Sequence, residues 1–228
     1  GVQGLGLESK NKLDAWILSE LHLLIEDVTK AMEQYDLTSA TRPLIDFVDN
    51  LSNWYVRRSR RRFWKSENDG DKSAGYETLS TVLITLSKLI APFMPFLSDV
   101  LFKNLTGKKS VHLEDWPTAD KKFIKRELHE EIRAVRTIVS LALKLRAKKN
   151  IKVRQPLAKL TLALPEHFPQ KLVEPYLDVI REELNVKEIV FEMEGKLARK
   201  MVAVDARKIG PRFGADTQEI IKLSKQGD

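Results

Sequence analysis

Apolar residues recur every three or four positions through most of the first 150 residues, a spacing that predicts long amphipathic helices. The first helix is expected to span residues 12–33. The second begins after Asp36, where Thr38 or Ser39 can cap the free amide groups, and it continues into residues 51–66. The polar stretch SENDGDKSAG then ends it.

Two further helices complete this part of the chain. The third is expected from about Ser73 to Gly107. Pro92 and Pro95 interrupt its hydrogen bonding, so we expect two helical pieces joined at a kink. The fourth is expected to span residues 120–149, with a buried side made of Leu128, Ile132, Val135, Ile138, Val139 and Leu145. Four long antiparallel helices of this kind form a bundle.

The pattern changes beyond Asn150, where shorter apolar segments replace the helical period. The elements expected there are strands at residues 157–164 and 186–193, a helix at 169–185 between them, a third candidate strand at 198–206 and a short helix from about Asp216. The predicted fold is therefore mainly α. It consists of an antiparallel helix bundle in residues 1–155 and a small α+β appendage in residues 156–228.

The charge distribution adds a functional hint to this fold. The net charge is only +7, but residues 51–65 and residues 144–154 each carry six basic residues and no acid. Together these clusters hold +12, so the rest of the chain sums to −5. A basic patch on a slightly acidic body is typical of a protein that binds a polyanion such as nucleic acid.

The first cluster lies on the second predicted helix and can be sorted by a helical wheel of 3.6 residues per turn. The core side is expected to contain Tyr55, Val56, Ser59 and Phe63, in line with Val48, Leu51 and Ser52. The candidate nucleic-acid contacts of this cluster are Asn53, Trp54, Arg57, Arg58, Arg60, Arg61, Arg62, Trp64 and Lys65. Arginine favours bidentate phosphate contact, and an indole can stack on an arginine, a nucleobase or a neighbouring domain. The alternative is a solvated face whose arginines pair with acids of neighbouring helices.

The second cluster runs off the end of the fourth helix into a loop closed by Pro156. The candidate contacts there are Lys148, Lys149, Lys152 and Arg154, which can reach phosphates, and Gln155, which can read a base edge. Pairing with the helix C-terminus is an alternative explanation for Lys148 and Lys149.

Composition excludes several other functions. The chain has no cysteine, which removes disulfides and cysteine-ligated zinc and fits a reducing compartment. Its histidines lie far apart in sequence, so no catalytic or metal-binding residue is assigned; they are His22, His112, His129 and His167. No apolar run approaches the ~20 residues of a membrane span, and the first residues do not form a signal peptide. A soluble intracellular chain with a cut N-terminal end and no membrane partner is expected.

Several segments resemble a known family. They are LDAWILSELHLLIEDVTKAMEQYDLTSA, FVDNLSNWYVRRSRRRFW, LSKLIAPFMPFLSD, SVHLEDWP and KNIKVRQPL, and in this order they resemble the anticodon-binding region of the isoleucyl-tRNA synthetases, which are class I aminoacyl-tRNA synthetases. The resemblance implies a cytoplasmic helix bundle that binds the anticodon stem and loop of isoleucine tRNA, with no DNA partner. It also implies a parent enzyme that uses ATP, with magnesium, to join isoleucine to that tRNA.

The family's catalytic signatures are missing. His-x-Gly-His and Lys-Met-Ser-Lys-Ser do not occur, since KMVAV at Lys200 shares only two letters with the second, and no editing domain is present. The resemblance therefore implies an excised C-terminal portion that binds no cofactor and is inactive alone. In that case the arginine face has a second candidate partner. It could dock the missing catalytic domain, or another protein, without any RNA specificity of its own.

Overall fold

The computed structural model describes residues 11–64, 70–165 and 168–193. The chain divides into two compact units, residues 1–133 and 134–228. The third candidate strand and the short last helix lie outside the described residues. No helix in the described ranges combines the length and the apolar character needed to cross a membrane.

The first two predicted helices are confirmed. α1 spans Lys12–Glu33, and α2 (Leu37–Asp49) continues without a break through a π-helical segment, η1 (Asn50–Val56), into α3 (Arg57–Phe63). The expected cap of α2 was wrong: the cap is Asp36, whose Oδ1 accepts a hydrogen bond from the Ser39 amide at 3.0 Å. Because the helix already begins at residue 37, Thr38 and Ser39 lie inside its first turn.

The kink predicted in the third helix is confirmed, because α4 (Gly70–Ile90) and α5 (Pro95–Thr106) are separate helices. Gly107 ends α5 in the left-handed region, at φ 69°, where glycine alone is unstrained. Short 3₁₀ turns at Val111–Leu113 and Lys121–Phe123 lead into α6 (Arg126–Lys148).

α6 starts later than expected and differs from its predicted buried face at one end. Ile132, Val135, Ile138 and Val139 are buried as predicted. Leu145 was wrongly placed in the core, because its side chain is 63% exposed and the neighbouring Arg146 is buried instead.

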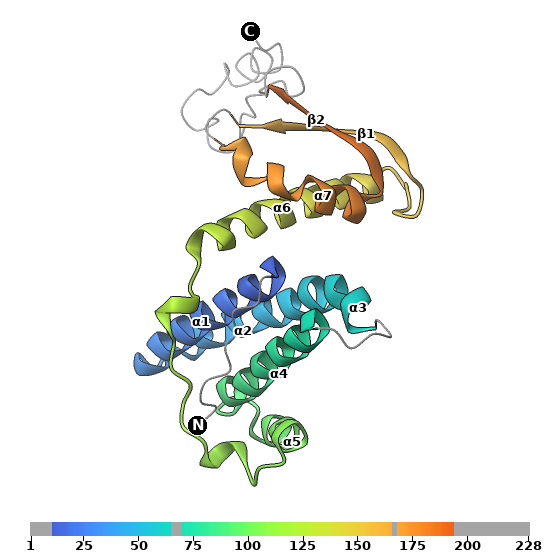
Figure 1. Ribbon diagram of the computed structural model, residues 1–228. Coiled ribbons are helices and arrows are strands. Elements are labelled where there is room, and N and C mark those ends of the chain that lie inside the picture. The colour runs from blue at the N-terminus through green and yellow to red at the C-terminus, as the bar shows by residue number, and fades with distance from the viewer. Residues whose placement is uncertain (1–10, 65–69, 166–167, 194–228) are drawn as a thin grey trace, which may run out of the picture. The chain divides into compact units, whose positions relative to one another are not determined.

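The core of residues 1–133 is built around α1, whose buried positions follow the helical period. Trp16, Ile17, Leu21, Leu24 and Val28 are each at most 4% exposed. α1 packs against α2 and α4, and α4 packs against α3 and α5 (Figure 1). The predicted helix bundle is confirmed in this arrangement.

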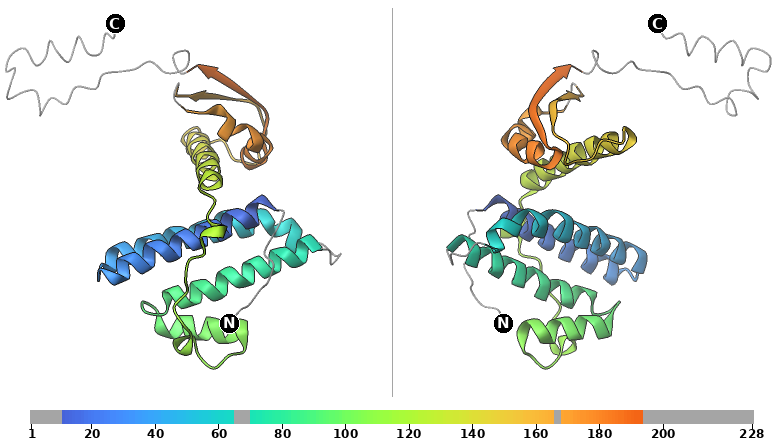
Figure 2. Two further views of the ribbon diagram at one scale, coloured as in Figure 1. Left: turned by 60° about the vertical axis from the view of Figure 1, so that its left-hand side comes forward. Right: turned by 90° about the vertical axis from the view of Figure 1, so that its right-hand side faces the viewer.

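Residues 134–228 contain the predicted α+β appendage. β1 (Leu157–Leu164) and β2 (Val186–Met193) match the predicted strands residue for residue and form a parallel pair, with Leu157 opposite Val186. Parallel strands need a crossover connection. Here it contains two 3₁₀ turns (Gln170–Leu172 and Glu174–Tyr176) and α7 (Leu177–Leu184), which covers one face of the sheet (Figure 2).

The division between the two units falls within α6, upstream of the expected domain boundary at residue 155. The domain boundary expected at residue 155 stays a prediction.

Candidate nucleic-acid interface

The helix that carries the first basic cluster keeps one face buried over an unusual length. Phe47, Leu51, Tyr55, Ser59 and Phe63 are all buried and recur every four residues. In an ideal α-helix each step of four advances 40° too far, so four steps would turn Phe63 about 160° away from Phe47. The π-helical segment Asn50–Val56, with its wider i→i+5 turn, absorbs this drift.

The π-helical segment also corrects the predicted faces. Trp54 was expected among the exposed arginines, but its side chain is only 5% exposed and belongs to the core. Val48 and Ser52 were expected on the core side and are exposed instead, while Val56 is half-buried. The wheel failed because it applied 3.6 residues per turn through a segment that is not α-helical.

The exposed side of the helix presents a single stripe of polar and aromatic residues. We call it the arginine stripe, and its members are Asn53, Arg57, Arg60, Arg61 and Trp64. From Arg57 to Trp64 the spacing is i, i+3, i+4 and i+7, which places these four side chains on one helix face. The stripe therefore joins three exposed cations to one exposed indole.

Local contacts hold parts of the arginine stripe in place. The Arg57 Nε donates to the Asn53 carbonyl oxygen at 2.8 Å, and the Asn53 amide donates to the Asp49 carboxylate at 2.6 Å. The Arg60 guanidinium lies 5.2 Å from the ring centroid of Trp64, whose side chain is 76% exposed. An exposed indole backed by a cation is a surface on which a planar ring can stack.

Two more candidates from this cluster lie next to the stripe or beyond the described residues. Arg58 is half-buried, and its guanidinium lies 5.7 Å from the ring of the buried Trp54. Lys65 lies outside the described residues.

Arg62 does not belong to the exposed surface, contrary to its assignment as a contact residue. Its guanidinium forms a bidentate ion pair with Asp14, with both nitrogen–oxygen distances at 2.7 Å, and its Nε donates to the Asp71 carbonyl at 2.8 Å. The Asp14 side chain is fully buried and also accepts from the Tyr55 hydroxyl at 2.7 Å. Arg62 therefore ties α3 to α1 and α4.

Burial and charge set the titration of this cluster. Burial, followed by the negative charge of Asp14, raises the pKa of the Tyr55 hydroxyl well above its ordinary value. Burial lowers the pKa of Arg62, but the hydrogen bonds and charge of Asp14 outweigh this, so the net pKa is raised. Tyr55 therefore stays neutral and Arg62 stays charged throughout the physiological range.

Gly75 on α4 allows this close packing. A methyl group at its Cα would lie 3.0 Å from the Arg62 Cζ and 3.0 Å from the Phe63 Cε1. The absence of a side chain lets the guanidinium and the ring approach the α4 backbone.

The candidates of the second cluster are all exposed. They are Lys148, Lys149, Lys152, Arg154 and Gln155. Asn150 adopts the left-handed region at φ 56° and turns the chain away from α6. A tight turn follows, in which the Gln155 amide donates to the Lys152 carbonyl at 3.0 Å. Arg154 lies within this turn.

Asp14 and Arg146 are structurally important but were not recognised from the sequence. The sequence did contain an indication of their burial, because each residue lies at helical spacing from apolar residues on the buried face of its helix. Asp14 precedes Ile17 and Leu21 at helical spacing, and Arg146 follows Val139 by two turns. A charged residue in such a phase indicates a buried charge with dedicated partners.

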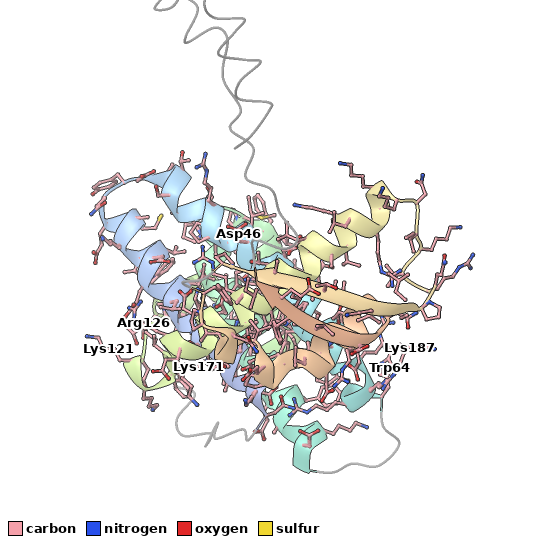
Figure 3. The ribbon with its side chains drawn as sticks, turned by 90° about the horizontal axis from the view of Figure 1, so that it is seen from above. Asp46, Trp64, Lys121, Arg126, Lys171 and Lys187 are labelled. Atoms are coloured by element: carbon pink, nitrogen blue, oxygen red, sulfur yellow. The ribbon has the colours of Figure 1, made fainter. Side chains whose placement is uncertain are left out.

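A groove of about 530 Å³ lies elsewhere on residues 1–133, between α1, α2 and the start of α6. Figure 3 labels Asp46 and Arg126, two of its lining residues. Its carboxylates are Glu20, Glu26, Asp27, Asp46 and Glu130, against two arginines, Arg42 and Arg126. This excess of negative charge opposes a polyanion, so the groove is a poor candidate for the same ligand.

The class of protein follows from comparison with known families. The chain belongs to the family described as the anticodon-binding domain of tRNA ligase, whose model matches residues 14–162. This match covers α1 except its first two residues, α2 to α6 and six of the eight residues of β1, and it therefore includes both basic clusters.

Three curated relatives of the chain are isoleucine–tRNA ligases, as the sequence motifs indicated. The chain is 49% identical over 190 residues to that of Dehalococcoides mccartyi strain CBDB1, covering 81% of this chain and 19% of the relative. It is 42% identical over 219 residues to that of Bacillus thuringiensis strain Al Hakam, covering 95% and 21%. With the ligase of Nocardia farcinica it shares 41% identity over 222 residues, covering 97% and 20%. The chain thus spans about a fifth of the length of these relatives.

Proposed function

We propose that this chain binds the anticodon stem and loop of an isoleucine tRNA. The observation that carries the proposal is the arginine stripe, an exposed row of cations and one indole on a member of an anticodon-binding family. The arginines would contact phosphates, and Trp64 would stack on an unpaired base of the loop. The exposed candidates of the second cluster, residues 148–155, would add further phosphate contacts and one base-edge contact through Gln155.

We further propose that the chain serves a cytoplasmic, ATP-dependent ligase that joins isoleucine to its tRNA; the names of two relatives, isoleucine–tRNA ligase, support the joining of isoleucine to tRNA. Magnesium, ATP and the catalytic residues would then act in a separate catalytic domain. The 228-residue chain alone should show no aminoacylation when it is incubated with isoleucine, ATP and tRNA.

Direct RNA binding tests the main proposal. Affinity of the 228-residue chain for an isoleucine tRNA transcript would be measured at several salt concentrations, next to a transcript with an altered anticodon. Phosphate contacts predict a steep loss of affinity with salt, and Arg57→Ala, Arg60→Ala or Arg61→Ala should each weaken binding and reduce the salt slope by about one. Trp64→Ala should weaken binding by about 1–3 kcal/mol.

Lys121→Ala provides a matched control. Lys121 is also exposed, but Figure 3 shows it well separated from Trp64 within the same unit. Its loss should leave RNA affinity unchanged. Equal binding of both transcripts would contradict anticodon recognition.

A protein-docking role for the arginine stripe predicts a different outcome. In that case the chain would ignore tRNA at physiological salt and bind a separately expressed catalytic domain from one of its relatives. The same stripe variants would then weaken the protein contact.

A further inference from the structure

Within the second basic cluster, the residue with the most extensive buried contacts is Arg146. We propose that Arg146 is a positioning residue, which fixes the turn at residues 152–155 in the form that presents Lys152 and Arg154 to RNA. The RNA part of this proposal rests on the proposed function. The structural part concerns the turn alone.

Arg146 joins the turn at residues 152–155 to the end of α7, and we call Arg146 together with Asn185 the clamp. Its side chain is buried, and one terminal nitrogen, Nη1, donates to the carbonyl oxygens of Lys152 and Gln155, both at 3.1 Å. The other, Nη2, donates to the carbonyl oxygens of Leu184 at 2.6 Å and Asn185 at 3.3 Å. One guanidinium therefore joins both ends of the turn to the C-terminal end of α7.

Asn185 completes the clamp from the opposite segment. Its side-chain amide donates to the Val153 carbonyl at 3.0 Å, and its own carbonyl accepts from the Leu157 amide at 3.0 Å, where β1 begins. The backbone of Asn185 lies in the left-handed region, at φ 48°. The turn is thus held by side chains from two elements and leads directly into the sheet.

These contacts also determine which charged groups the turn exposes. The carbonyls of Lys152, Val153 and Gln155 all accept hydrogen bonds from the clamp, so their negative ends are covered by donors. The side chains of Lys152 and Arg154 are exposed. A polyanion approaching the turn therefore meets two exposed cations, while three of the four carbonyl oxygens at residues 152–155 are covered by donors.

The charge of Arg146 adds to this effect. Within the described part of the chain, the hydrogen-bond partners of its guanidinium are carbonyl oxygens rather than a carboxylate. Carbonyl dipoles satisfy its donors but do not cancel its positive charge. The turn therefore lies above a buried cation whose field is of the sign that attracts phosphate.

Arg146→Lys separates geometry from charge, because an ammonium keeps the charge but cannot hold four carbonyls in the planar arrangement of a guanidinium. The first measurement is amide hydrogen exchange in the 228-residue chain without RNA. The Gln155 amide should exchange at least about tenfold faster in Arg146→Lys. Asn185→Gly keeps the left-handed backbone and removes only the bond to Val153, so it should act in the same direction by about threefold. Arg181→Lys, an exposed conservative change on α7, serves as the control and should leave this amide unchanged.

The second measurement is a double-mutant cycle on affinity for the isoleucine tRNA transcript. Arg154→Ala should weaken binding about fivefold in the native background and less than about twofold when Arg146→Lys is present, because the turn is then already misplaced. Arg146→Lys alone should weaken binding about tenfold and reduce the salt slope by more than one, whereas loss of a single direct phosphate contact reduces it by about one.

Two results would overturn the proposal. Unchanged exchange of the Gln155 amide in both Arg146→Lys and Asn185→Gly would show that the clamp does not hold the turn. Additive losses in the double-mutant cycle would show that Arg146 acts independently of Arg154. If instead Lys152→Ala and Arg154→Ala both leave RNA affinity unchanged, the RNA contact proposed for this cluster is wrong. The hydrogen-exchange measurement would still test whether the clamp holds the turn.

Discussion

Arg61 and Arg62 are neighbours in sequence but should respond in opposite ways to the same substitution. Arg62→Met removes one partner of a buried ion pair and takes the guanidinium away from the fully buried Asp14 carboxylate, which still accepts from the Tyr55 hydroxyl. Removing one partner of such a pair costs about 3–5 kcal/mol of unfolding free energy, because the remaining charge is buried without its counter-charge. Arg61→Met alters an exposed side chain and should change stability by less than about 0.5 kcal/mol.

Urea unfolding followed by circular dichroism measures this difference. With a denaturant dependence of about 2 kcal/mol per molar urea, the unfolding midpoint of Arg62→Met should fall by about 2 M at an unchanged slope. The double variant Asp14→Leu with Arg62→Met should be more stable than either single variant, because it removes both buried charges together. Affinity for tRNA should show the reverse order: Arg61→Met should weaken it, while Arg62→Met, under conditions where it is folded, should retain most of it.

The reasoning would be refuted if Arg62→Met unfolded at the same urea concentration as Arg61→Met. It would also be refuted if the double variant lost the sum of the two single effects. Either result would mean that the buried pair does not hold α3 to α1.

Three further predictions concern other parts of the fold. Gly75→Ala should destabilise the chain by about 1–3 kcal/mol in thermal unfolding, because the added methyl would lie 3.0 Å from the Arg62 Cζ; an unchanged melting temperature would contradict the packing described for α4. Gly107→Ala should lower the free energy of unfolding by about 1–2 kcal/mol, because the φ of 69° at this position strains any residue with a Cβ. Gly107→Asn should lower it by less. Equal losses of stability in the two variants would refute this explanation. Hydrogen bonds from Lys108 and Lys88 lower the pKa of Glu114 to about 2, below its ordinary value of 4.5. The stability that Glu114 contributes should therefore be complete above about pH 5 and be lost as the pH falls towards 2. The difference in unfolding free energy between the native chain and Glu114→Gln should shrink over that pH range. A difference that stays constant with pH would contradict this prediction.

The sequence predicted most of the secondary structure because its apolar period is regular. Ile17, Leu21 and Val28 specify α1 by spacing alone, and β1 and β2 stand out as short apolar runs between turns. The parallel pairing of the two strands was not predicted, because spacing along one chain does not reveal which edges meet. The kink between α4 and α5 was predicted because proline has no amide hydrogen to donate.

The candidate site was predicted less completely, and the reason lies in long-range partners. The wheel could not anticipate the π-helical segment, so Trp54 was placed on the wrong side. Composition marked Arg62 as one more cation of its cluster, because its partner Asp14 lies 48 residues earlier. Local sequence was enough to predict that the cluster forms a basic surface. Which of its arginines are buried depends on contacts with residues far away in the sequence.

The π-helical segment gives the helix a property that composition does not record. Winding Asn50–Val56 as a regular α-helix would preserve the number of arginines, the net charge and the helical character of the chain. It would nevertheless restore the drift of 40° for every four residues, so that Arg57 and Arg61 would point in a new direction relative to α1. The identity of the side chains and the direction in which they face are thus set separately, and two chains with the same arginines could present them to different partners.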